Sequence, residues 1–125
     1  MKKYKNGVIG EIEAARYLRK KKFTILAGNY NTRFGEIDII AADKKYIVFV
    51  EVKTRADSHL MLPREAVDLK KQAKIIKAAS IYISNHKPLL QPRFDVIEII
   101  TKTKFGFEML KFNHIENAFG MKGYL

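Results

Sequence analysis

The segment from Phe34 to Arg55 constrains the fold more than any other part of the sequence. It reads FGEIDIIAADKKYIVFVEVKTR, and its two runs rich in isoleucine and valine are typical of β-strands. The connection between the runs is so short that they should form an antiparallel hairpin. Charged residues interrupt both runs, although a carboxylate in a protein interior is costly unless something neutralises it. The sequence therefore raises the question of what these charges do.

The alternation of side chains along the hairpin predicts which charges meet. If the turn is centred on Lys44 and Lys45, Asp38 faces Glu51 across the two strands, with Cβ atoms about 5 Å apart. Lys53 points to the same face as Glu51 because the side-chain repeat of a strand is two residues. The hairpin is thus predicted to gather two carboxylates and a lysine on one patch.

Two opposed carboxylates repel each other, and a divalent cation between them would reverse that effect. Mg²⁺ and Mn²⁺ prefer oxygen ligands, so Asp38, Glu51 and the main-chain carbonyl of Val52 are candidate ligands. Lys53 is then in place to orient an attacking water or to stabilise charge on a phosphate. One interpretation of this pattern is a metal-dependent site that acts on phosphate esters.

A purely structural network is the alternative interpretation. The same register pairs Glu36 with Lys53, which is a simple cross-strand ion pair. Arg33 or Arg55 could neutralise Asp38, and a bulge would shift the register and separate Asp38 from Glu51. The residues alone leave both interpretations open.

The remaining pattern predicts one α/β domain over residues 1–125. Asn6 is the expected N-cap of a helix that runs to about Lys22, and a second helix is expected from near Pro63 to roughly Asn85. Strands are expected at residues 23–31, 34–43, 46–55, 94–100 and 105–112, followed by an irregular tail. This order predicts a mixed sheet with helices covering its faces.

The first helix offers a further carboxylate. On a helical wheel Glu11 lies close to the apolar stripe formed by Val8, Ile12 and Ala15. A carboxylate beside a buried face is a candidate to support the metal site. An acid favoured by the helix dipole near its N-terminus is an equally good interpretation from spacing alone.

The net charge of +11 predicts a polyanionic partner. Nucleic acid is the favoured partner and an anionic membrane is the alternative, because a basic domain attracts both. No apolar run is long enough to span a bilayer, and the chain contains no cysteine for disulfides or for a cysteine-ligated zinc site. These features predict a cytoplasmic protein with no membrane partner.

Lysines at helical spacing on the second helix are candidates for phosphate contacts. Lys70, Lys74 and Lys77 form a row beside its apolar face, and Lys70 is the expected auxiliary of the active site. Lysine stems that cover apolar surface are the alternative interpretation of this row. Arg33 and Arg55 flank the hairpin and are further candidates for nucleic-acid binding.

Two motifs carry a resemblance to known nucleases. GEID at residues 35–38 and FVEVK at residues 49–53 resemble the core signature of the PD-(D/E)XK nuclease superfamily. Together, GEIEAARYL, GNYNTRFGEIDIIA, FVEVKTR and RFDVI resemble the bacterial YraN family, which is similar to archaeal Holliday-junction resolvases. The resemblance covers most of the chain and implies a restriction-endonuclease-like fold with an α-β-β-β-α-β core.

The resemblance also implies residue roles. The metal-binding aspartate of the superfamily falls on Asp38, and its acidic residue and lysine fall on Glu51 and Lys53. The glutamate on the first helix of the resolvase-like branch falls on Glu11. Ile37 departs from the signature, which often has proline there, but the aspartate is intact.

The sequence therefore predicts a Mg²⁺- or Mn²⁺-dependent DNA endonuclease that acts on branched or damaged structures. Cutting both strands of a junction in concert would require a symmetric homodimer. The second hypothesis is a binding module that keeps the nuclease fold and recognises nucleic acid or a partner protein without cutting.

Overall fold

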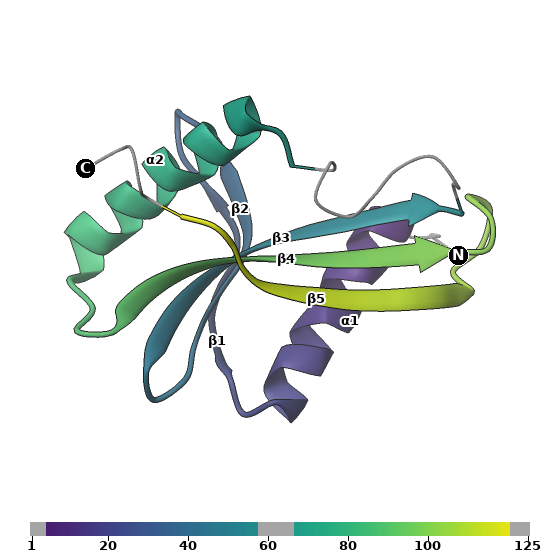
Figure 1. Ribbon diagram of the computed structural model, residues 1–125, viewed down its shortest axis with the longest axis horizontal. Helices are drawn as coiled ribbons and strands as arrows, with labels where there is room; N and C mark the ends of the chain where they lie inside the picture. Colours follow the sequence, from purple (N-terminus) through teal and green to yellow (C-terminus); the bar gives the residue numbers. More distant parts are fainter. Residues whose placement is uncertain (1–4, 58–66, 121–125) are drawn as a thin grey trace.

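The computed structural model of the protein describes residues 5–57 and 67–120. Its elements in chain order are α1 (Asn6–Lys20), β1 (Thr24–Asn31), β2 (Glu36–Ala42), β3 (Tyr46–Ala56), α2 (Leu69–His86), β4 (Gln91–Thr101) and β5 (Met109–Phe119). The five strands form one sheet in the order β1-β2-β3-β4-β5 (Figure 1). Strands β3 and β4 are parallel, and the other neighbours are antiparallel. The predicted α/β class and mixed sheet are confirmed.

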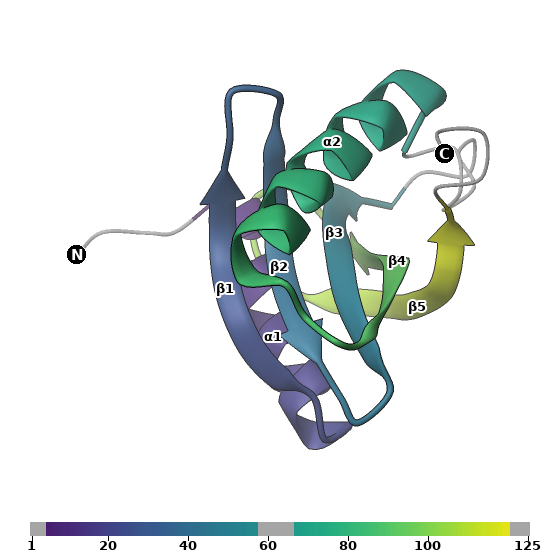
Figure 2. The same ribbon diagram turned by 90° about the vertical axis from the view of Figure 1, so that its left-hand side faces the viewer.

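The two helices cover opposite faces of the sheet. Figure 2 shows α2 in front of the strands and α1 behind them. On the α2 side, Phe49 and Phe94 of the sheet pack with Tyr82 of the helix. On the α1 side, Leu18 packs in a separate cluster with Val48. Burial on both faces explains why the central strands are continuous apolar runs.

The predicted register of the β2–β3 hairpin is confirmed. Ile39 pairs with Val50 and Ala42 pairs with Ile47, so the turn is centred on the expected pair of lysines. Asp43 fixes this turn, because its Oδ1 accepts hydrogen bonds from the backbone N–H groups of the second lysine and of the residue after it, at 2.8 and 2.7 Å. Such an Asx turn is a common way for aspartate to define a tight connection.

Helix α1 differs from the prediction in its cap and in its buried face. Lys5 occupies the N-cap position, and Asn6 lies inside the helix, where its side-chain amide donates to the carbonyl of Gly106. Val8 and Ile12 are 42% and 49% exposed, so the predicted apolar stripe is wrong.

The residues of α1 that face the sheet are Gly10, Ala14 and Leu18. A Cβ atom at Gly10 would overlap the hydroxyl of Thr54 on β3, so the helix approaches the sheet closely at this point. This close approach holds the residue that follows Gly10 in the chain, Glu11, near the strands.

The second helix and the last strand also have different bounds from those expected. Among the described residues α2 begins at Leu69, after Asp68 caps it by accepting from the N–H of Lys71 at 2.8 Å; the expected start at Pro63 lies outside the described residues. Strand β5 starts later than predicted and continues to Phe119, so the predicted irregular tail is wrong up to that residue. Within the described part of the chain, neither helix has the length and apolar character needed to cross a membrane.

Candidate functional site

Asp38 lies at a break in the regular pleat of β2. On either side of Asp38, Ile37 pairs with Tyr30 of β1 and Ile39 pairs with Gly28. Ile37 packs on the α2 side of the sheet, whereas Ile39 packs on the α1 side. Residues two positions apart in a regular strand share a face, so the alternation is broken between them.

The residue of β1 that lies between these pairs is Asn29, which has a left-handed φ of 50°. The distortion therefore spans both strands at the level of Asp38. Asn29 tolerates this conformation better than most residues. Local irregularity of this kind re-aims a side chain.

The pair of the β2–β3 ladder farthest from the turn is Ile39 with Val50. Asp38 and Glu51 are the chain neighbours of these two residues and lie just beyond that end of the ladder. In place of a further ladder bond, the backbone N–H of Val52 donates to Oδ2 of Asp38 at 2.8 Å. Glu51 is almost fully buried, with 5% of its surface exposed. The hairpin therefore places the two predicted carboxylates side by side at the end of its ladder.

Lys71 of α2 is the cation that meets this pair. Its Nζ lies 2.9 Å from Oε1 of Glu51, and the hydrogen bond to Glu51 raises the pKa of Lys71. The prediction that Lys70 reaches the active site is wrong, because the neighbouring lysine fills that position. The helix begins at Leu69, after its N-cap Asp68, and this start fixes which of two adjacent lysines faces the sheet.

Glu11 of α1 joins the site, as expected. Burial raises the pKa of Glu11, the charges of Glu36 and Glu51 raise it further, and a hydrogen bond with Asp38 lowers it. Two carboxyl groups share a hydrogen bond only when one of them is protonated. With its amide nitrogen turned towards the acids, Asn29 donates to Oε1 of both Glu11 and Glu36, at 2.9 Å each.

We call Glu11, Glu36, Asp38 and Glu51 the acidic cluster. Burial raises the pKa of Asp38 to about 8, the charge of Glu51 adds to this effect, and the hydrogen bond from the N–H of Val52 opposes it. A carboxyl group with such a pKa lies in surroundings that hold too little positive charge. A cavity between α1 and strands β1 and β2 gives access to it, and Glu11, Asn29 and Asp38 are among its lining residues.

The donor chemistry of the acidic cluster fits a hard divalent cation. Mg²⁺ is commonly held by one or two carboxylates and completes its shell with water or substrate phosphate. Asp38 and Glu51 would supply the carboxylates, and Val52 is the candidate for a main-chain ligand. Within residues 5–57 and 67–120, no three histidine, aspartate or glutamate side chains converge to enclose an ion. The fit is therefore to an open site rather than to a closed metal cage.

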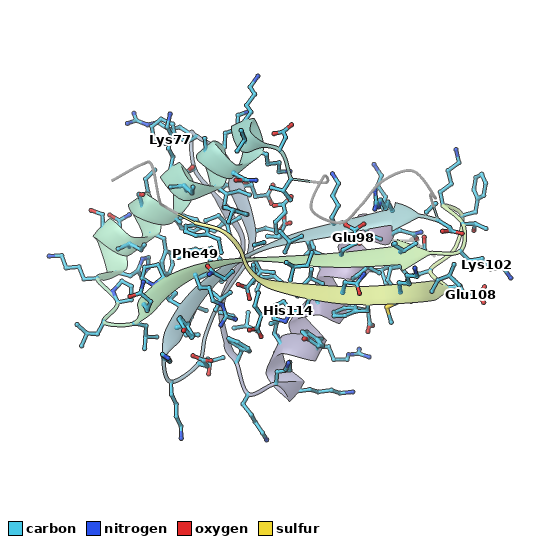
Figure 3. The ribbon with its side chains drawn as sticks, in the orientation of Figure 1. Phe49, Lys77, Glu98, Lys102, Glu108 and His114 are labelled. Atoms are coloured by element: carbon cyan, nitrogen blue, oxygen red, sulfur yellow. The ribbon has the colours of Figure 1, made fainter. Side chains whose placement is uncertain are left out.

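Lys53 and Arg55 lie beyond Glu51 on the same strand. Lys53 pairs with Glu98 of β4 in the parallel ladder, and its charge interacts with that carboxylate. Arg55 Nε lies 2.6 Å from Oε1 of Glu98, which is completely buried (Figure 3). The suggested cross-strand ion pair between Glu36 and Lys53 does not occur among the described ion pairs.

The other predicted cations lie on the outer surface. Lys70, Lys74 and Lys77 are exposed on α2, and Figure 3 shows Lys77 on the side of the helix away from the sheet. The guanidinium carbon of Arg33 lies 4.9 Å from the ring centroid of Phe34. Arg33 contacts Phe34 and Arg55 contacts Glu98, and among the described residues neither arginine is one of the groups that shift the pKa of Asp38.

A second polar cluster was missed by the sequence analysis. Arg93 donates to both carboxylate oxygens of Asp95, at 2.9 and 2.8 Å. Nε2 of His114 lies 2.7 Å from Oδ2 of Asp95, and its Nδ1 lies 2.8 Å from the hydroxyl of Tyr17. The side chain of His114 is only 4% exposed, so this histidine is a buried member of the cluster (Figure 3).

Comparisons with known proteins identify the relatives of the chain. The model of the family described as "Uncharacterised protein family UPF0102" matches residues 10–99. A UPF0102 protein of Caldanaerobacter subterraneus subsp. tengcongensis is 53% identical over 116 residues, which cover 90% of this chain and 93% of that protein. A UPF0102 protein of Alkaliphilus oremlandii is 45% identical over 92% of this chain and 97% of its own length. A third, from Clostridium acetobutylicum, is 47% identical over 92% of this chain and 93% of its own length.

Proposed function

We propose that this chain, which belongs to the uncharacterised protein family UPF0102, is a metal-dependent endonuclease that hydrolyses phosphodiester bonds in DNA. The observation that carries the proposal is the position of Asp38 and Glu51 just beyond the end of the hairpin ladder, where burial and the charge of Glu51 raise the pKa of Asp38. Strongly perturbed carboxylates in a cleft are typical of functional sites. A net charge of +11 supports a polyanionic substrate.

Each residue of the site has a role in this proposal. Asp38 and Glu51, with the carbonyl of Val52, would hold Mg²⁺ or Mn²⁺, which supplies charge stabilisation and a more acidic bound water. Glu11 lies within hydrogen-bonding distance of Asp38 and would support the site from α1. Lys53 would orient the attacking water or stabilise charge on the phosphate.

Exposed cations would hold the DNA backbone without reading its sequence. The exposed candidates are Lys70, Lys74, Lys77 and Arg33. Arg55 is the remaining candidate, but only 14% of its side chain is exposed and it is paired with the buried Glu98. The order α1-β1-β2-β3-α2-β4 supports a restriction-endonuclease-like core, to which β5 is added at the sheet edge. A symmetric homodimer would allow two strands of a branched substrate to be cut in concert.

One observation favours a second function, a binding module that does not cut. Lys71 already forms an ion pair with Glu51, so that carboxylate is neutralised by the chain itself. A binder of nucleic acid or of a partner protein could keep such a pair as part of its framework. The three other carboxylates of the acidic cluster argue against a module that binds nucleic acid at this place, because their negative charge opposes the approach of phosphates.

Cleavage of a labelled panel of linear, single-stranded, flapped and four-way DNA with Mg²⁺ or Mn²⁺ tests the proposal. Asp38→Asn keeps the shape of the side chain and an acceptor for the Val52 N–H but removes the charge. We expect it to lower the cleavage rate by about 100-fold or more, because metal-ion charge stabilisation is worth several kcal/mol. Salt-sensitive DNA binding should persist in this variant.

The matched control is Glu108→Gln, which neutralises a carboxylate with 69% of its side chain exposed near the start of β5. It should cleave like the wild type. Metal-dependent cleavage that survives Asp38→Asn would remove Asp38 from the mechanism. A wild type that binds every DNA in the panel and cuts none would leave the binding module as the function.

A further inference from the structure

The turn between β1 and β2 presents an aromatic ring between two cations. Phe34 is 37% exposed. The guanidinium carbon of Arg33 lies 4.9 Å from its ring centroid, and Nζ of Lys77 on α2 lies 5.5 Å from it. Both distances fall within the range of cation–π interactions. We call Arg33, Phe34 and Lys77 the aromatic platform.

The turn itself holds the platform in place. Oγ1 of Thr32 accepts hydrogen bonds from the N–H groups of Phe34 and Gly35, at 3.1 and 3.2 Å. A Cβ atom built on Gly35 would lie 3.2 Å from Cβ of Lys74, so the turn is seated against α2. Figures 1 and 2 both show the β1–β2 connection projecting beside this helix. Phe34 is therefore a fixed feature of the surface.

A hollow opens beside the ring. Its described lining comprises Phe34, Lys77, Ser80, Ile81, Ser84 and Asn85. The aromatic ring and the isoleucine give it apolar walls, and the hydroxyl and amide groups offer hydrogen bonds to a polar ring edge. None of these lining residues is acidic, so the charge around the hollow is positive.

We propose that this hollow receives an unpaired base of single-stranded nucleic acid. The base would take the place of the Lys77 ammonium over the ring of Phe34, and Lys77 and Arg33 would then contact its phosphates. Stacking on an aromatic side chain requires the face of a base, and only an unpaired or extruded base offers it. A duplex offers phosphates and groove edges and would gain only from the cations. This combination of a ring, flanking cations and hydrogen-bonding groups matches a nucleotide better than a purely apolar ligand.

The position of the platform relates it to the acidic cluster. Lys71 contacts Glu51 at one end, and Lys77 contacts Phe34 six residues later on the same helix. Six residues of α-helix span about 9 Å along the axis, and Lys74 lies between them. This distance is short enough for one bound strand to reach both the hollow and the acidic cluster. This inference deepens the proposed function and rests on it for the choice of nucleic acid as ligand.

Binding without divalent metal tests the inference separately from cleavage. Fluorescence anisotropy in EDTA would measure the affinity of the protein for a labelled oligothymidine strand and for a labelled duplex of equal length. We expect Phe34→Ala to weaken single-strand binding by about 5- to 100-fold, the range for loss of one base stack. Duplex binding should change less than twofold.

Phe105→Ala is the matched control. Phe105 is 89% exposed, and Nζ of Lys104 lies 5.5 Å from its ring centroid, but it lies in the β4–β5 connection, and no hollow beside it is described. This variant should bind both DNAs like the wild type. Phe34→Leu should behave like Phe34→Ala, and Phe34→Trp should keep single-strand binding, because only the latter retains an aromatic face.

The inference is overturned if Phe34→Ala binds single strands like the wild type, if it loses duplex affinity equally, or if Phe105→Ala shows the same loss. Such a failure would leave the nuclease proposal standing if the wild type still cuts DNA in Mg²⁺. Conversely, a selective loss in Phe34→Ala with no cleavage of any substrate would support the platform and remove the nuclease proposal.

Discussion

Asp38 and Asp95 are aspartates in strands of the same sheet, and the chain surrounds them in opposite ways. Asp95 accepts hydrogen bonds from Arg93, from His114 and from the backbone N–H of Asn117. Asp38 accepts one from a backbone N–H and otherwise faces carboxylates of the acidic cluster. The two residues therefore share a chemical group and differ in how completely the protein neutralises it.

The difference is visible in their pKa values. Burial raises the pKa of Asp95, but the hydrogen bonds from His114, Arg93 and Asn117 outweigh it, so the pKa lies below the ordinary value. Burial and Glu51 together raise the pKa of Asp38 to about 8. A carboxylate whose charge is balanced by side chains of the protein stabilises the fold. A carboxylate that lacks such partners can bind a ligand that supplies the positive charge. This contrast supports a structural role for Asp95 and is the electrostatic basis of the cation site that we propose at Asp38.

The largest expected effect is the loss of stability in Asp95→Ala. The substitution leaves Arg93 and His114 without their buried partner, and breaking a buried pair in this way costs about 3–5 kcal/mol. Urea unfolding followed by circular dichroism would measure the change in the free energy of unfolding. A loss below about 1 kcal/mol would mean that Asp95 is not the structural centre that we describe.

Asp38→Asn should act in the opposite direction. A raised pKa means that the folded protein binds this proton more tightly than the unfolded chain, so its contribution to stability falls as the pH rises from about 4 to about 8. We expect the free energy of unfolding of the variant to exceed that of the wild type by on the order of 2 kcal/mol at pH 8. At pH 4 the two free energies should be nearly equal.

These measurements belong in chelator, so that no cation neutralises the acidic cluster. Asp95 should show the opposite pH dependence, because its pKa is lower in the folded protein than in the unfolded chain. Its contribution to stability is present above the pKa of the unfolded chain and is lost as the pH falls through the pKa of the folded protein. If Asp38→Asn were destabilising at pH 8, the two aspartates would be equivalent and the contrast between them would fail.

Much of the fold follows from local rules that the sequence displays. The hairpin register could be predicted because the connection between the two strands is short and Asp43 marks a tight turn. The buried face of α1 could not, since the helix packs through Gly10 against Thr54, and a wheel cannot show how close two elements come. Strand β5 was partly missed because it is an edge strand whose side chains are mostly exposed, which weakens its apolar pattern.

The same limit applies to the candidate site. The meeting of Asp38 with Glu51 rests on one hairpin, so spacing was sufficient to predict it. Lys71 was missed because its choice over Lys70 depends on where α2 starts. The partnership of His114 with Asp95 requires the pairing of β4 with β5, which the sequence does not display locally.

The smallest expected effect belongs to Lys71, the cation that meets the acidic cluster. Its side chain is 48% exposed, so water screens its ion pair with Glu51, and Lys71→Gln should lower stability by only about 0.5 kcal/mol at pH 8. The loss should shrink in the Asp38→Asn background, because that variant removes part of the negative charge that Lys71 offsets. Lys70→Gln is the matched control, since this exposed neighbour belongs to no described ion pair.

A double-mutant cycle of Lys71→Gln and Asp38→Asn, measured by urea unfolding, would show this coupling directly. Equal losses in Lys71→Gln and Lys70→Gln would indicate a general effect of surface charge rather than a contact with the cluster. A coupling larger than about 2 kcal/mol would mean that Lys71 neutralises the acidic cluster almost as fully as Arg93 and His114 neutralise Asp95. The two centres would then be alike, and the case for an added cation at Asp38 would lose its electrostatic basis.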